Sequence, residues 1–137
     1  MPERKIMKRA QADLREGKSA STAAGEFVRE EIHHIREGKH GARNTKQAIA
    51  IGLSKARRAG VPLKAPEPGK TSERTRHAAE RAYEAGQHDG ASHEPSRRRS
   101  RAIERALERE PHQAASRANL SKQAKSAATR RRRAEAR

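Results

Sequence analysis

The chain has no cysteine and no tryptophan, and it is poor in aromatic residues of any kind. Without cysteine it can form neither disulfides nor cysteine-based zinc sites. Phe27 and Tyr83 are its only aromatic residues, too few to build a platform of rings on which nucleic-acid bases could stack. No run of residues approaches the roughly 18 apolar positions of a membrane span, and the N-terminus lacks the apolar segment of a secretory signal. These absences predict a cytoplasmic protein without a membrane partner.

Large apolar residues are also scarce. Leu, Ile, Val and Phe supply only 14 of the 137 residues, whereas 36% of the chain is charged. Ordering the backbone of one residue costs roughly 1–2 kcal/mol, and a buried large aliphatic side chain returns only roughly 1.5–3 kcal/mol. A single core through the whole chain is therefore excluded, and so is a catalytic pocket that such a core would have to build. We predict a protein that is not an enzyme and that binds no cofactor.

Nine of these 14 residues lie between residues 20 and 63, which predicts the folded part of the chain. Residues 21–37 repeat apolar side chains at spacings of three and four and end at Gly38, a pattern typical of an amphipathic helix. Glu31 falls within the apolar stripe of this helix. We therefore expect Glu31 to pair with a lysine or arginine of the following helix.

Residues 46–59 form the second predicted helix of this part. Asn44 and Gln47 resemble a capping box at its start, and Gly60 marks its end. Val61 follows that glycine, as in a helix stop whose next residue packs back against the last turn. The alternation at residues 48–51 would also fit a short strand, but the caps at both ends favour a helix.

Ile51 lies on the side of this second helix opposite to Ile49, so it faces away from the expected core. Small residues surround it. We interpret Ile51 as a contact for self-association.

The predicted fold is all-α, with a small hairpin-like helical unit flanked by basic arms that are helical or disordered. Three prolines and a glycine within residues 61–72 predict a linker after the unit. The expected segments are an N-terminal basic helix (1–19), the helical unit (20–63), a linker with a weak helix (64–95) and an arginine-rich arm, disordered or helical on binding (96–137).

The net charge of +16 is unevenly distributed along the chain. Residues 1–60 carry 14 Lys and Arg against 7 Asp and Glu, residues 61–95 carry 5 against 6, and residues 96–137 carry 14 against 4. Surfaces this positive attract polyanions, and nucleic acid is the partner that we predict.

Two groups of basic residues are the candidate phosphate contacts. One surrounds the helix at 46–59, and the other lies in the C-terminal arm, where Lys122 and Lys125 accompany four consecutive arginines. The predicted nucleic-acid-binding residues are Lys39, His40, Arg43, Lys46, Lys55, Arg57, Arg58, Arg97, Arg98, Arg99, Arg101, Arg130, Arg131, Arg132 and Arg133.

Seven histidines suggest a metal site only at first sight. His33 and His34 are adjacent on a helix, so their side chains point about 100° apart and cannot share an ion as residues four apart can. We predict no bound metal.

Residues 25–32, Gly-Glu-Phe-Val-Arg-Glu-Glu-Ile, and residues 37–48, Glu-Gly-Lys-His-Gly-Ala-Arg-Asn-Thr-Lys-Gln-Ala, resemble a family of short, highly basic bacterial proteins. The domain shared by that family has no assigned function. The resemblance covers about residues 18–63 and implies a bacterial source, but it implies no activity.

The leading hypothesis is a nucleoid-associated protein that binds or compacts DNA with little sequence preference. An RNA-binding or ribosome-associated protein is the nearest alternative. A further alternative is a protein-interaction adaptor, which would dock its partner through Phe27, Ile35 and Ile51.

Overall fold

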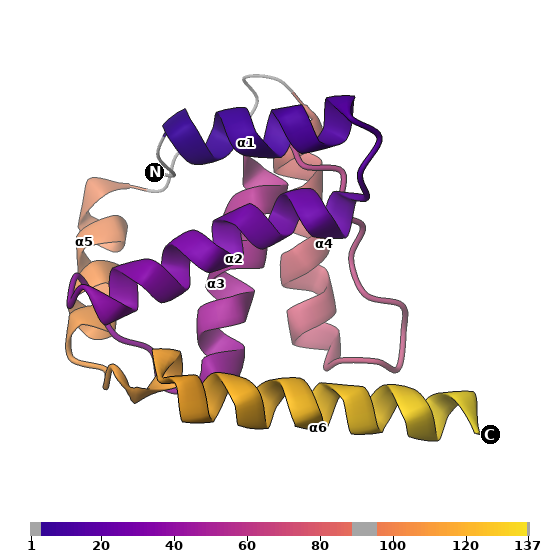
Figure 1. The fold of residues 1–137 in the computed structure, drawn as a ribbon. Coiled ribbons are helices and arrows are strands. Elements are labelled where there is room, and N and C mark those ends of the chain that lie inside the picture. Colours follow the sequence, from indigo (N-terminus) through magenta and orange to yellow (C-terminus); the bar gives the residue numbers. More distant parts are fainter. Residues whose placement is uncertain (1–3, 89–95, 137) are drawn as a thin grey trace. The chain divides into compact units, whose positions relative to one another are not determined.

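The structure, a computed structural model, describes residues 4–88 and 96–136 and is built there from α-helices without any strand (Figure 1). The helices are α1 (Arg4–Arg15), α2 (Ala20–Arg36), α3 (Thr45–Arg58), α4 (Glu73–Gln87), α5 (Arg97–Glu108) and α6 (Arg117–Glu135), with a short 3-10 turn, η1 (Gln113–Ala115), before α6. The all-α prediction is confirmed, and residues 48–51 are helical. Within these described ranges, no helix has both the length and the apolar composition needed to cross a membrane.

The chain divides into two compact units, and both draw on distant parts of the sequence. Unit 1 comprises Met1–Glu31 and Ala50–Pro95, and unit 2 comprises Ile32–Ile49 and Ser96–Arg137. This grouping differs from the predicted segments, which kept residues 20–63 together. The physical reason is a set of hydrogen bonds that tie the loop before α3 to the segment before α6, described below.

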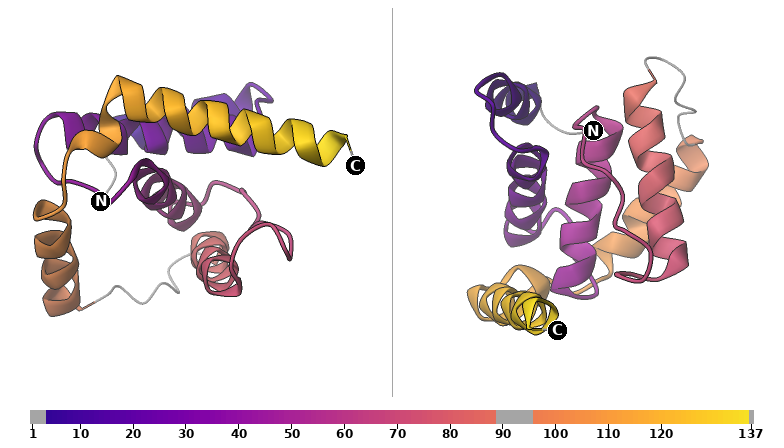
Figure 2. Two further views of the ribbon diagram at one scale, coloured as in Figure 1. Left: turned by 90° about the horizontal axis from the view of Figure 1, so that it is seen from below. Right: turned by 90° about the vertical axis from the view of Figure 1, so that its right-hand side faces the viewer.

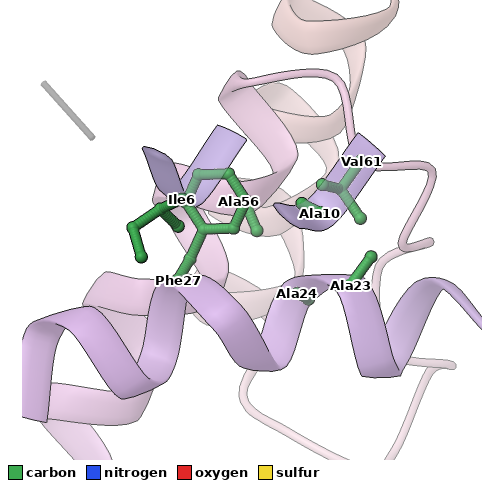
Figure 3. Close-up of a cluster of buried hydrophobic side chains, with 7 residues drawn as sticks. All are labelled: Ile6, Ala10, Ala23, Ala24, Phe27, Ala56 and Val61. Atoms are coloured by element: carbon green, nitrogen blue, oxygen red, sulfur yellow. The ribbon is translucent and has the colours of Figure 1, made fainter. Parts of the chain in front are cut away.

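Unit 1 has a small apolar core around Phe27, whose side chain is fully buried. Figure 3 shows this ring between Ile6 of α1 and Ala56 of α3. The backbone N–H of Val61 donates to the carbonyl of Ala56 at 3.0 Å, and both side chains belong to the core. The predicted stop of α3 is therefore confirmed, with Val61 packed back against the last turn.

Helices α2 and α3 also meet within unit 1 through an ion pair whose carboxylate is buried. The Glu31 carboxylate is completely buried and accepts a hydrogen bond from Lys55 Nζ, as expected for a charge placed in an apolar stripe. Beside this pair, a Cβ atom at Gly52 would lie 2.6 Å from the Cα of Val28. A glycine is required at that position because the two helix backbones approach closely there.

Helix α4 belongs to unit 1 as well, although the sequence predicts only a weak helix in a linker. Its side chains Ala79 and Ala82 are buried. Ser72 caps its first turn, and at its other end Gln87 Nε2 donates to the carbonyl of Gly60 at 3.2 Å. Alanine is small enough to let helices pack closely, so this segment is packed without any large aliphatic residue.

Unit 2 is held together by hydrogen bonds between the loop before α3 and the segment before α6. The N–H of Gly41 donates to Leu107 O at 2.8 Å, and the N–H of Ala42 donates to Pro111 O at 3.0 Å. A Cβ atom at Gly41 would lie 1.9 Å from Glu110 O. Only glycine permits two backbones to approach this closely.

Two side chains extend this connection to η1. Thr45 Oγ1, at the start of α3, donates to Ala114 O at 2.7 Å, and Arg36 Nε, at the end of α2, donates to Ala115 O at 2.9 Å. We call these four hydrogen bonds, between residues 36–45 and residues 107–115, the unit-2 seam. The seam fixes the start of α6 against the start of α3.

The two C-terminal helices present most of their surface to solvent. Neither α5 nor α6 contains a fully buried residue, and Ile103 of α5 is 53% exposed. Figure 2 shows α6 as one uninterrupted helix. Ser116 caps its first turn by accepting the N–H of Asn119 at 3.1 Å. These helices occupy the stretch that the sequence assigned to an arm.

Candidate nucleic-acid interface

Almost all of the net positive charge lies in unit 2. Its two stretches contain 18 Lys and Arg against 5 Asp and Glu, which is +13 of the total of +16. Unit 1 is nearly balanced, with 15 against 12. Because a more positive surface attracts polyanions more strongly, unit 2 is the better candidate for a polyanion site.

The C-terminal residues predicted to bind nucleic acid all have exposed side chains. They are Arg97, Arg98, Arg99 and Arg101 on α5, and Arg130, Arg131, Arg132 and Arg133 on α6. None of them forms an ion pair with an acidic side chain within the part of the chain that the structure describes. They are therefore available to external phosphates.

On α5 the arginines form a stripe. Arg98, Arg101, Arg105 and Arg109 follow one another at intervals of three and four residues, which places them on one side of the helix. At 1.5 Å per residue the stripe is about 16 Å long. Duplex DNA carries one charge per ~1.7 Å of its axis, so a stripe of this length can reach several phosphates.

A second stripe follows the exposed side of α6. It consists of Lys122, Lys125, Arg132 and Arg133, whereas the half-buried Ala127 lies on the opposite side of the helix. This stripe also extends over about 16 Å. Unit 2 thus carries two cationic helix faces of equal length.

Lys39 and His40 are engaged in local contacts. Lys39 Nζ lies 3.3 Å from the Glu37 carboxylate, and its hydrogen bond is the main cause that lowers the pKa of Glu37 below its ordinary value. His40 Nδ1 lies 2.9 Å from Gly41 O, and its ring meets that of His34 edge to face at 6.4 Å. The ionised Glu37 therefore offsets the charge of Lys39.

The predicted contacts Lys55, Arg57 and Arg58 belong to unit 1, and the first two are engaged in contacts within it. Lys55 is paired with a buried carboxylate, as described above. Arg57 is only 7% exposed, and its guanidinium donates to the carbonyls of Leu63 at 3.0 Å and Lys64 at 3.3 Å. Burial lowers its pKa from the ordinary value of an arginine. Both residues hold the end of α3 in place, and Arg58 alone is exposed.

Unit 2 contains a surface cleft of about 390 Å³ between the first turn of α3, η1 and the first turns of α6. We call it the unit-2 cleft. It is lined by Arg43, Asn44, Thr45, Lys46, Pro111, Gln113, Ala114, Asn119, Lys122, Gln123 and Ser126. Residues that are more than 60 positions apart in the sequence meet here because the seam joins them.

The cleft is cationic. Arg43, Lys46 and Lys122 line it with exposed side chains, and no acidic residue is among the described residues that line it. Its α3 side is fixed by a reciprocal cap, because Asn44 Oδ1 accepts the N–H of Gln47 at 2.8 Å and Gln47 Oε1 accepts the N–H of Arg43 at 2.6 Å. The near capping box predicted from the sequence therefore positions two of the predicted cations.

The sequence did not single out the carboxamides of the cleft. These are Asn44, whose predicted role was only that of a cap, and Gln113, Asn119 and Gln123. Asparagine and glutamine are common on any surface, so no local pattern marks these four. They come together in one cleft only because the seam holds η1 and α6 at the start of α3.

The apolar residues predicted to dock a partner protein lie inside the chain. Phe27 and Ile35 have no exposed surface, and Ile51 is half-buried. Docking through Phe27 or Ile35 would therefore require this part of the chain to open first.

A comparison of the chain with family models, with curated proteins and with solved structures finds no match. The resemblance of residues 18–63 to a family of basic bacterial proteins therefore stays a prediction.

Proposed function

We propose that unit 2 binds nucleic acid without sequence preference, with duplex DNA as the favoured partner, and that the protein compacts DNA in a bacterial nucleoid. The role is non-catalytic. The observation that supports it most is the concentration of +13 charge in unit 2, carried largely by exposed helix faces.

The binding would be driven by the release of counterions. Each phosphate that a lysine or arginine neutralises frees a condensed cation, so the logarithm of the binding constant falls by about 0.9 per neutralised phosphate for each logarithmic unit of salt. Two stripes of four cations, one on α5 and one on α6, would give a slope of several units. Neither stripe contains a rigid set of hydrogen-bonding side chains aimed at base edges, which is why sequence preference should be small.

The test compares two triple variants that remove the same charge from different units. Lys125→Gln, Arg132→Gln and Arg133→Gln remove three of the four cations of the α6 stripe, whereas Lys5→Gln, Lys8→Gln and Arg9→Gln remove three exposed cations of α1. Fluorescence anisotropy of several unrelated duplexes, repeated at several salt concentrations, measures affinity and slope. Circular dichroism checks that both variants keep their helix content.

The α6 variant should bind every duplex more weakly, with a slope smaller by about 0.9 for each phosphate that is no longer neutralised. The α1 variant should retain most of the affinity. Equal reductions of affinity in the two variants would mean that the affinity depends only on the net charge of the protein. The proposal that unit 2 is the binding site would then be refuted. Absence of binding at physiological salt, or displacement of DNA by a structured RNA at equal phosphate concentration, would overturn the DNA proposal.

A further inference from the structure

The unit-2 cleft has the volume of a site for a small group. Its volume of about 390 Å³ lies within the range of roughly 300–1,000 Å³ typical of ligand sites. A duplex presents its phosphates on a convex surface and keeps its bases stacked inside. Only a nucleotide that has left the stack can enter such a concavity.

One end of the ligand should be a phosphate. Arg43, Lys46 and Lys122 reach the cleft from two helices and the loop before α3, and the described lining includes no carboxylate that would repel an anion. The first turn of α3 also borders the cleft. Asn44 takes the N–H of Gln47 there, and the N–H groups at the very start of a helix have no partner within that helix. Three cations together with these amides are more than a monovalent carboxylate requires.

The rest of the lining does not fit a bare phosphate. Gln113, Asn119 and Gln123 each carry a carbonyl oxygen as well as an amino group, and a phosphate diester offers no hydrogen atom to such oxygens. One of these groups is already used, because Asn119 Nδ2 donates to Gln113 O at 2.6 Å. A nucleobase edge carries both donors and acceptors, which is what the remaining carboxamide atoms can pair with.

The cleft also offers an apolar surface. Pro111 and Ala114 belong to its lining, and their side chains carry no polar atoms. A flat, weakly polar base face can lie against such a surface. Because no aromatic ring is present among these lining residues, the base would be held by its edge and not by stacking.

We infer that the unit-2 cleft binds one unpaired nucleotide of a DNA strand, with its phosphate between Lys46 and Lys122 and its base edge at Gln123. This inference rests on the proposed function and narrows it. The protein should prefer DNA that contains unpaired nucleotides over a fully paired duplex. Carboxamides can present either a donor or an acceptor to a base, so the preference for particular bases should be small.

The first experiment compares a duplex with the same duplex from which a few nucleotides of one strand are missing. The gapped DNA has fewer phosphates, so charge alone predicts weaker binding. We expect it to bind about tenfold more tightly, which is within what one well-paired base edge contributes. Gln123→Leu should abolish this preference without changing the affinity for the paired duplex. Gln11→Leu, the same substitution at an exposed position of α1, should preserve it.

The second experiment uses small competitors with the same phosphate group. A nucleoside 5′-monophosphate should displace the gapped DNA at a lower concentration than ribose 5-phosphate does. Equal competition by the two would show that the cleft recognises phosphate alone and would overturn the part played by the base.

The two proposals fail in different ways. If no DNA binds at physiological salt, the proposed function itself is refuted. Both DNAs could bind with a steep salt dependence while the gap does not increase the affinity, or while Gln123→Leu leaves the tighter binding of the gapped DNA unchanged. In either case only the nucleotide site is wrong.

Discussion

Replacing Thr45 by valine tests the hydrogen bond on which the unit-2 cleft depends. The hydroxyl of Thr45 donates to Ala114 O at 2.7 Å, and both residues are buried. Valine has nearly the same shape, so Thr45→Val removes the hydrogen bond and little else. The carbonyl of Ala114 then remains in the interior without this donor.

The expected cost follows from that buried acceptor. Leaving a buried carbonyl without its partner costs about 1–3 kcal/mol. A tenfold change in an equilibrium constant corresponds to ~1.4 kcal/mol. The opening of the seam should therefore become roughly 5 to 150 times more frequent, and the amides of Gly41 and Ala42, which donate across the seam, should exchange faster by the same factor.

Hydrogen exchange is the appropriate assay because unit 2 has no aromatic residue. Phe27 and Tyr83 both belong to unit 1, so near-ultraviolet signals report on unit 1 alone. Thr129→Val is the matched control. Its hydroxyl also donates to a carbonyl, that of Lys125 at 3.0 Å, but on the exposed surface of α6, where substitutions usually cost less than about 0.5 kcal/mol.

Unchanged exchange at Gly41 and Ala42 in Thr45→Val would refute this reasoning. It would mean that the segment before α6 is not held against the start of α3 by this bond. The unit-2 cleft would then lose its physical basis, whereas the two cationic stripes would be unaffected.

Three other substitutions test further parts of the molecule. Phe27→Ala removes a fully buried ring and should destabilise unit 1 by about 3–5 kcal/mol in urea unfolding followed at Tyr83; a decrease below about 1 kcal/mol would contradict the packing. Gly41→Ala places a methyl group 1.9 Å from Glu110 O and should accelerate amide exchange across the seam more than Thr45→Val does. Arg57→Gln should lower the stability of unit 1 by about 1–3 kcal/mol, because it removes hydrogen bonds to the carbonyls of Leu63 and Lys64. It should leave the salt slope of DNA binding unchanged. A smaller slope would instead identify Arg57 as a phosphate contact.

The helices could be read from the sequence because their signals are local. Apolar spacing and the residues at the helix ends placed the observed helices α2 and α3 within one or two residues of the predicted ranges. The buried charge of Glu31 was also predictable, since a carboxylate in an apolar stripe requires a cation from the facing helix, and Lys55 supplies it. Predictions of this kind depend on a few neighbouring residues.

The division into units could not be predicted because its contacts carry no large apolar signature. Among the residues that the structure describes, ten of the 15 buried apolar side chains are alanines, including Ala114 and Ala115 before α6. Counting large aliphatic residues therefore missed the packing of the C-terminal half. The seam itself uses backbone groups of Gly41 and Ala42, which leave no pattern in a sequence.

The candidate site was predicted in part. The sequence correctly placed exposed cations on α5 and α6, because charge runs are visible without a structure. It named both Arg57 and Arg58 as phosphate contacts, because the sequence does not show that the carbonyls of Leu63 and Lys64 lie within reach of the Arg57 guanidinium. Telling the two arginines apart requires the path of the chain after α3.

The charge of unit 2 also gives salt two opposite effects on this protein. Unit 2 has 18 lysines and arginines but only five acidic residues. In the free protein its excess positive charges repel one another, and this repulsion opposes the compact state of the unit. Added salt shortens the range of the repulsion, to about 8 Å at physiological strength, and should stabilise the free unit while it weakens binding to DNA. A bound polyanion relieves the same repulsion, so DNA should raise the melting temperature of unit 2 most at the low salt concentrations where the free unit is least stable.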